Sequence, residues 1–171
     1  GASASRNLGI LNAKNHTISF LDADDHFLTN RFKEDKLIFE SDSSIDGVYN
    51  AISPYSFDLN GQNRLKNIKY KLTTLDKYFS SDELFYHMGP IGTSGHFSLN
   101  GLTIKKEALL KVGLMNPNLR LSQDTHISIK LAAVCKLEPG IIDKPVAKFA
   151  VHQNNRSQYS DQIQGNRAYL F

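Results

Sequence analysis

The chain contains no tryptophan, one cysteine and no long apolar run. Because a single cysteine excludes an internal disulfide, we expect a reducing compartment. The place of Cys135 on the apolar side of a predicted helix indicates a buried structural thiol. No apolar stretch approaches the roughly 18 residues that a membrane-spanning helix needs, and no signal-peptide pattern opens the chain. We therefore expect a cytoplasmic protein, at most peripheral to the inner face of a membrane.

The chain also lacks a large excess of positive or of negative residues. The 20 Lys and Arg residues nearly balance the 17 Asp and Glu residues, and a net charge of +3 is too small to imply nucleic-acid binding. One basic stretch over residues 64–77 fits either a solvated helix face or a contact with an anionic membrane surface or an acidic substrate. A hydrophobic content of 40% over 171 residues excludes wholesale disorder and gives one domain enough apolar side chains for a core.

The order of the predicted elements is that of an α/β domain. The patterns predict helices from a Ser3 or Ser5 cap to about residue 13, then over residues 30–40, 105–112 and 124–135, and strands over residues 17–21, 48–52, 97–104, 141–142 and 146–151. The apolar faces predicted for three of the helices are Leu8, Ile10 and Leu11, then Phe32, Leu37 and Phe39, then Ile127, Leu131 and Val134. Residues 53–86 have looser spacing and predict an insertion or a substrate-facing flap.

An acidic cluster follows the first predicted strand. Three carboxylates, Asp22, Asp24 and Asp25, fall within four positions directly after the apolar run at residues 18–21. Like charges at this spacing repel, so the cluster is either a solvated turn that caps the next helix or a site for a divalent cation shared with a phosphorylated ligand. Loops at the carboxyl ends of strands are where α/β proteins bind ligands. On its own this motif leaves both alternatives open.

Five short motifs, taken in order, resemble the family 2 glycosyltransferases of the GT-A fold. The motifs are Ala-Ser-Arg-Asn-Leu-Gly at residues 4–9, Phe-Leu-Asp-Ala-Asp-Asp at 20–25, Val-Gly-Leu-Met at 112–115, Gln-Asp at 123–124, and Val-His with the later Asn155 and Ser157 at 151–157. The resemblance implies a mixed, Rossmann-related sheet flanked by helices. That family opens with a strand of the type Val-Ser-Ile-Ile-Ile-Pro-x-Tyr-Asn and a second strand, which together grip the nucleobase, and nothing similar precedes Ala4.

The resemblance therefore implies that residues 1–155 are the carboxyl-terminal part of a GT-A catalytic domain, followed by a polar tail or helix over residues 156–171. A domain without its first nucleotide-binding strands is expected to be inactive alone. It is also expected to expose the strand edge at residues 18–21, which favours a homo-oligomer.

The same resemblance implies an inverting, metal-dependent transfer of a sugar from a nucleotide-diphosphate donor, most often a UDP-sugar. The acceptor would be a glycan or a lipid-linked hydroxyl, in polysaccharide biosynthesis at the cell envelope. Asp24 would bind Mg²⁺ or Mn²⁺, with His152 as a second contact to the metal or diphosphate. Asp22 would contact the ribose or a metal-bound water, and Arg6 and Asn7 would line the nucleotide site, where a guanidinium suits phosphate.

Asp124 would be the general base, because the acceptor hydroxyl must lose its proton as it attacks the anomeric carbon. Its structural alternative is a favourable negative charge at the start of a helix. Gln123 stands where the family usually has an acidic residue, a departure that removes one acceptor or one charge from the site. The segment around His96 lies close in sequence to the predicted strand and is a further candidate for the acceptor side.

Two other classes of protein remain open at this level. A phosphatase of the haloacid dehalogenase type also carries Asp-x-Asp at a strand end, although its later motifs cannot be placed here. The other alternative is a sugar-binding module with no catalytic activity. Hydrolysis or transfer assays separate these classes from a glycosyltransferase.

Overall fold

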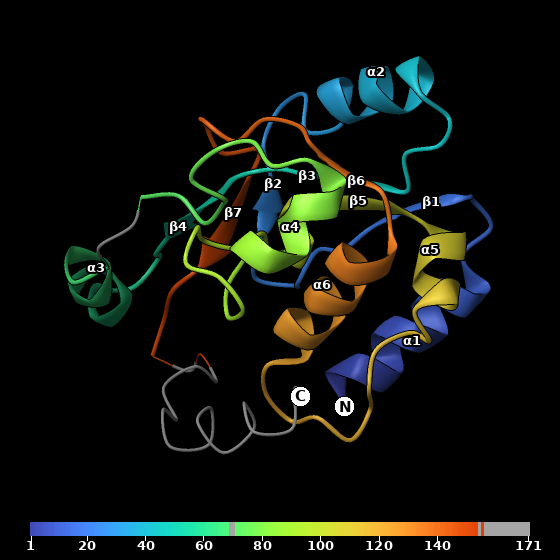
Figure 1. The fold of residues 1–171 in the computed structure, drawn as a ribbon. Coiled ribbons are helices and arrows are strands. Elements are labelled where there is room, and N and C mark those ends of the chain that lie inside the picture. The colour runs from blue at the N-terminus through green and yellow to red at the C-terminus, as the bar shows by residue number, and fades with distance from the viewer. Residues whose placement is uncertain (69–70, 154, 156–171) are drawn as a thin grey trace.

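The computed structural model describes residues 1–68, 71–153 and 155, and it forms two mixed sheets flanked by helices (Figure 1). One sheet has the strand order β1-β5-β3-β6 and the other has the order β2-β7-β4. The strands are β1 Thr17–Ser19, β2 His26–Phe27, β3 Gly47–Tyr49, β4 Ile52–Tyr55, β5 Leu102–Lys105, β6 Leu137–Pro139 and β7 Ala147–Ala150. This arrangement confirms the predicted α/β class with mixed sheets.

The helices of the described part are α1 Ala2–Asn12, α2 Lys33–Ser41, α3 Leu59–Lys66, α4 Ser81–His87, α5 Lys106–Lys111, α6 Gln123–Val134 and the 3-10 turn η1 Leu99–Gly101. In Figure 1, α1, α5 and α6 lie together below the strands, α2 lies above them, and α3 lies beside β4 at the opposite side from α5. Among the residues that the structure describes, no helix is long and apolar enough to cross a membrane.

Strand pairing is antiparallel for β1 with β5, β5 with β3 and β2 with β7, and parallel for β3 with β6 and β4 with β7. β1 lies at one edge of its sheet, with Ile18 opposite Ile104 of β5. The main core fills the space beside this sheet with side chains from β3, β5, α4, α5 and α6. Cys135 belongs to this core, as predicted, and burial raises the pKa of its thiol to about 11.

The predicted strand over residues 48–52 is in fact two strands, and the chain crosses from one sheet to the other between them. At the crossing, the buried Asn50 donates to Asp35 Oδ1 at 2.9 Å and to the Gly101 carbonyl at 3.1 Å, and accepts from the Ile141 backbone at 2.7 Å. The amide side chain thus joins α2, η1 and the segment after β6 at the crossing. The seam between the two sheets is a polar junction rather than a continuous strand.

The inner face of α2 differs from its prediction. Phe32 and Leu37 are 44% and 51% exposed, whereas Asp35 is buried. The carboxylate of Asp35 lies 2.6 Å from the guanidinium of Arg31 and accepts from Thr103 Oγ1 as well. Burial lowers the pKa of Arg31, while Asp35 opposes that shift. A buried ion pair with further hydrogen bonds therefore replaces the expected apolar stripe.

Other predicted details are also corrected. Of the three apolar residues predicted to face inward on α1, only Ile10 is buried, while Leu8 and Leu11 are exposed, and Val134 is 50% exposed at the end of α6. Residues 141–142 form no strand, because the pairing with β3 is made earlier by β6. Residues 53–86 contain the end of β4, all of α3 and most of α4, and their role as an insertion or flap stays a prediction. The predicted tail over residues 156–171 lies outside the described residues.

Candidate functional site

A cleft of about 860 Å³ lies at the junction of the two sheets and collects residues from both ends of the chain. Of the six site residues predicted from the sequence, five line it, namely Arg6, Asp22, Asp24, Asp124 and His152. Asn7 does not line it. The fold thus assembles in one place side chains that are up to about 150 positions apart in the sequence.

The acidic turn joins β1 to β2 and therefore links the two sheets. Its backbone closes through a hydrogen bond from Asp25 N to the Asp22 carbonyl at 3.1 Å. Asp25 accepts from the Ala150 backbone at 2.8 Å and from the Asn100 side chain, and burial raises its pKa despite these bonds. Asp25 therefore fastens the turn to β7 and η1, and leaves Asp22 and Asp24 as the half-exposed carboxylates at the cleft.

Arg6 joins one carboxylate of the acidic turn, Asp22, to Asp124 at the start of α6. Its Nη2 lies 2.6 Å from Asp22 Oδ1 and its Nη1 lies 2.8 Å from Asp124 Oδ1. Burial lowers the pKa of Arg6, but the two neighbouring carboxylates outweigh this and raise it. One guanidinium from α1 therefore holds the acidic turn and the start of α6 together. A guanidinium has five N–H donors, so a phosphate contact of Arg6, as predicted, would use donors other than the two that face these carboxylates.

Asn7 has a different partner. Its side chain donates to the Met115 carbonyl at 2.8 Å and accepts from the Met115 backbone N–H at 3.0 Å. The paired hydrogen bonds fix α1 to the loop that leads into α6, which places Arg6 opposite Asp124. Neighbouring residues on a helix point about 100° apart, so Arg6 and Asn7 serve different surfaces.

Asp24 and His152 form a pair on the other side of the acidic turn. His152 Nε2 lies 3.0 Å from Asp24 Oδ2, and the imidazole side chain is only 16% exposed. The loop after β7 that carries His152 is closed by Asn155, which accepts from the His152 backbone at 2.6 Å and donates to the Ala150 carbonyl at 3.1 Å.

The chemistry of this pair suits a divalent cation completed by a ligand. Within residues 1–68, 71–153 and 155, no group of three His, Cys, Asp or Glu side chains is placed to hold a metal ion. Mg²⁺ in nucleotide sites is held by one or two carboxylates together with phosphate oxygens, and a neutral imidazole suits Mn²⁺. His152 Nε2 and Asp24 Oδ2 lie at hydrogen-bond distance, 3.0 Å, which is also roughly the separation of two neighbouring ligands of an octahedral ion at about 2.1 Å.

Asp124 is the second residue of α6, with its side chain about half exposed. Gln123, which precedes it, donates to the Leu119 carbonyl at 2.6 Å. A carboxylate at this position has no proton to donate, so the amide suits the tight loop that enters the helix, where Ser122 has a φ of 59°. Gln123 therefore holds the segment that presents Asp124 to the cleft.

Several other cleft residues were not singled out by sequence motifs. They include Thr73, Phe97, Ser98, Arg120 and Ser128. His96, on the segment expected on the acceptor side, lines the cleft as well. Although His96 is exposed as a whole residue, the surroundings of its ring desolvate it and lower its pKa.

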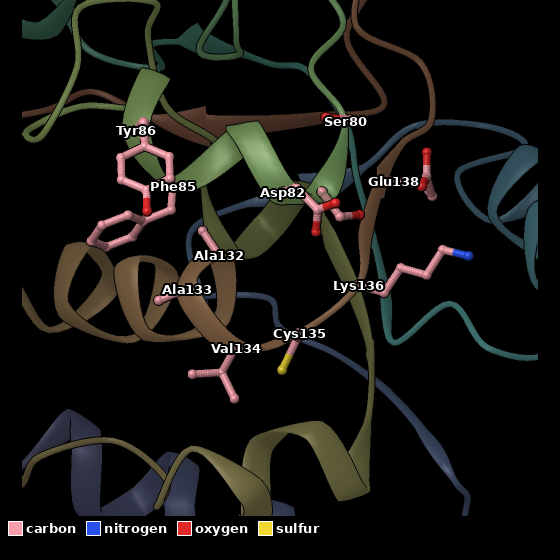
Figure 2. A pocket seen from close by; sticks show the side chains of 11 residues that line it. Ser80, Asp82, Phe85, Tyr86, Ala132, Ala133, Val134, Cys135, Lys136 and Glu138 are labelled. Atoms are coloured by element: carbon pink, nitrogen blue, oxygen red, sulfur yellow. The ribbon is translucent and has the colours of Figure 1, made fainter.

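A second hollow, of about 630 Å³, lies between α4 and the end of α6 (Figure 2). None of the predicted site residues lines it. Figure 2 shows the thiol of Cys135 directed away from Asp82 and Phe85, and its raised pKa keeps it protonated at neutral pH. Five of the six predicted site residues thus line the cleft at the seam, and none lines this second hollow.

Comparisons with known proteins agree with this architecture. No family model matches the chain. An uncharacterized glycosyltransferase from Haemophilus influenzae is 24% identical over 98% of this chain, and one from Methanocaldococcus jannaschii is 28% identical over all of it. Each match covers 53% of the relative, so the chain spans about half the length of the curated relatives it matches.

Solved structures of a glycosyltransferase have a similar fold. The structure of S. aureus TarS 1–349 with UDP-GlcNAc is similar over 92% of this chain and 41% of that one, with a TM-score of 0.62 and 13% identity. The complex of the same TarS segment with UDP has a TM-score of 0.59 over 88% of this chain. The fold is of the glycosyltransferase type. The predicted GT-A-like class is thereby confirmed, while the roles of the individual site residues stay predictions.

Proposed function

We propose that the chain is part of a metal-dependent, inverting glycosyltransferase of family 2 that uses a nucleotide-diphosphate sugar. The observation that carries the proposal is the geometry of the cleft, where Arg6 joins Asp22 to Asp124 beside the pair of Asp24 and His152. The candidate proton acceptor and the candidate cation site would thus lie on either side of one acidic turn. The glycosyltransferase names of the two relatives and the UDP and UDP-GlcNAc complexes of TarS support a UDP-sugar as the donor.

Each side chain has a defined task in such a transfer. Asp24 and His152 would hold Mg²⁺ or Mn²⁺, which when bound supplies Lewis-acid stabilisation to the departing diphosphate. Asp22 would accept from a ribose hydroxyl or a metal-bound water. Asp124 takes the proton from the acceptor hydroxyl while the oxygen attacks the anomeric carbon and the bond to the diphosphate breaks.

Direct displacement of this kind inverts the anomeric configuration, because the hydroxyl attacks the face opposite the leaving group. Arg6 keeps Asp124 in place during this step and balances the negative charge of the neighbouring carboxylates. The acceptor in this proposal is a glycan or lipid-linked hydroxyl of a cell-envelope polysaccharide, extended at the inner face of the membrane.

The test is a screen of nucleotide-sugar donors with the full-length protein, read by the released nucleoside diphosphate, with Mn²⁺ and with a chelator. We expect release that needs the cation and is lost in Asp24→Ala, while Asp143→Ala, which removes an exposed carboxylate outside the cleft, stays active. Phosphate release from a simple ester would instead identify a phosphatase. Sugar binding without release from any donor would identify a binding module, and either result would overturn the proposal.

A further inference from the structure

The segment that runs from β4 into α3 contacts both members of the pair formed by Asp24 and His152. β4 is parallel to β7, with Tyr55 opposite Ala150, and the Tyr55 carbonyl accepts from Val151 N at 2.8 Å. The Tyr55 hydroxyl donates to the Asp24 carbonyl at 2.5 Å. One tyrosine at the end of β4 therefore touches the backbone on both sides of the candidate cation site.

Two side chains beyond Tyr55 act directly on His152. The ring of Phe57 stacks on the imidazole, with centroids 5.5 Å apart and planes inclined by 28°. Phe57 is nevertheless 64% exposed, so burial in the core does not explain its position. Arg64 Nη1 donates to the His152 carbonyl at 2.6 Å. The ring and the backbone of His152 are thus each held by a different residue of this segment.

The helix α3 approaches the His152 loop closely at its first turn. A Cβ built on Gly61 would meet the Val151 carbonyl oxygen at 2.0 Å, so only glycine fits there. Asp58 caps the helix by accepting from Gly61 N. Asn60 Nδ2 donates to Gln153 Oε1 at 3.1 Å, one residue beyond His152. In Figure 1, α3 lies away from the other helices, so these contacts account for its position beside the strands.

We propose that Phe57 and Arg64 are positioning residues that hold the imidazole of His152 at ligand distance from Asp24. This inference rests on the proposed cation site and extends it to residues that no motif indicated. Because the described residues place no third His, Cys, Asp or Glu side chain for this ion, the site depends strongly on the separation of Asp24 and His152, here 3.0 Å. Outer contacts that orient a metal-binding histidine typically change metal affinity by about 10- to 100-fold when removed.

The experiment measures Mn²⁺ binding to the full chain by calorimetry and by paramagnetic broadening of the His152 ring protons, with Mn²⁺ as the only ligand. We expect Phe57→Ala and Arg64→Ala each to weaken binding by about tenfold. Phe57→Tyr should bind Mn²⁺ as tightly as the unaltered chain does, because a tyrosine ring stacks equally well on the imidazole. Leu59→Ala, on the same helix as Arg64 and 78% exposed, is the matched control and should bind as the unaltered chain does.

A merely structural role is separated by unfolding measurements, since it predicts that weaker Mn²⁺ binding in Phe57→Ala accompanies a loss of folded protein, whereas the positioning role predicts weaker binding by protein that remains folded. Unchanged Mn²⁺ affinity in Phe57→Ala and Arg64→Ala, with loss of binding in Asp24→Ala, would overturn this inference alone. Unchanged affinity in Asp24→Ala and His152→Ala would overturn the cation site itself and the inference with it.

Discussion

Replacement of Asp124 by asparagine separates the catalytic role of this carboxylate from its structural role. The change keeps the size of the side chain and its ability to accept from Arg6 Nη1, now 2.8 Å away, but removes the proton acceptor. It also removes a negative charge from the first turn of α6. A catalytic role predicts that the activation barrier of transfer rises by more than the free energy of unfolding falls. A purely structural role predicts changes of similar size in both.

The structural loss is small. The side chain of Asp124 is 49% exposed, so screening limits its ion pair with Arg6 to about 0–1 kcal/mol of stability. The charge at the start of the helix contributes about 0.3–1 kcal/mol, and asparagine keeps the capping ability. The free energy of unfolding should therefore fall by no more than about 2 kcal/mol.

The catalytic loss is larger. A positioned general base contributes about 10²- to 10⁴-fold to the rate, which at 1.36 kcal/mol per tenfold corresponds to roughly 2.7–5.5 kcal/mol in the barrier. We expect the initial rate of sugar transfer by the full-length protein to fall by at least about 100-fold, with donor affinity nearly unchanged.

The matched control is Asp82→Asn, because Asp82 is likewise the second residue of its helix, α4, and lies outside the cleft. Transfer rates and urea unfolding are measured for both variants. A barrier change in Asp124→Asn no larger than its loss in stability, or an equal rate loss in Asp82→Asn, would refute the assignment of Asp124 as base.

Three further predictions concern stability. Asn7→Ala removes two hydrogen bonds to Met115 and should lower the free energy of unfolding in urea by about 1–3 kcal/mol. The affinity of the full-length protein for UDP should stay unchanged, and a selective loss of UDP binding would instead support the predicted nucleotide role of Asn7. Asp35→Asn leaves the charge of Arg31 buried without a counter-charge and should cost about 3–5 kcal/mol by the same measurement; a loss below about 1 kcal/mol would contradict a tightly buried pair. The pKa of Cys135 is raised to about 11 from 9.0, so its contribution to stability should be complete below pH 9 and be lost as the pH rises through 11. Thermal unfolding across this range checks the last prediction against Cys135→Ser, which should lack that component.

The sequence predicted the elements that bury a simple apolar stripe. α5, α6 and β7 lie within one or two residues of their predicted bounds, because Ile127 and Leu131 follow helical spacing and the apolar run over residues 146–151 bounds β7. The split between β3 and β4 could not be predicted in this way. It depends on Asn50, whose partners lie in α2, in η1 and after β6, far away in the sequence.

The same limit explains the misassigned face of α2. Arg31 and Asp35 have the spacing of an exposed ion pair on a helix surface, and only the position of Thr103 in a distant strand makes that side the inner one. For the cleft, motif order predicted five of its lining residues. The separate task of Asn7, and the contacts of Phe57 and Arg64 with His152, depend on tertiary placement that no local pattern encodes.

The bridge from Arg6 to Asp124 also bears on how the chain folds. The two residues are 118 positions apart, whereas Arg6 and Asp22 are separated by only 16. Closing a loop costs conformational entropy that rises by about 0.6 kcal/mol for each doubling of its length, and a half-exposed ion pair gains too little to offset a closure of this size alone. The contact to Asp124 therefore forms only after packed helices and strands have brought the ends together. The contact between Arg6 and Asp124 thus forms together with the cleft. A chain whose folding stops earlier contains all the residues of the cleft, but they are not yet close together in space.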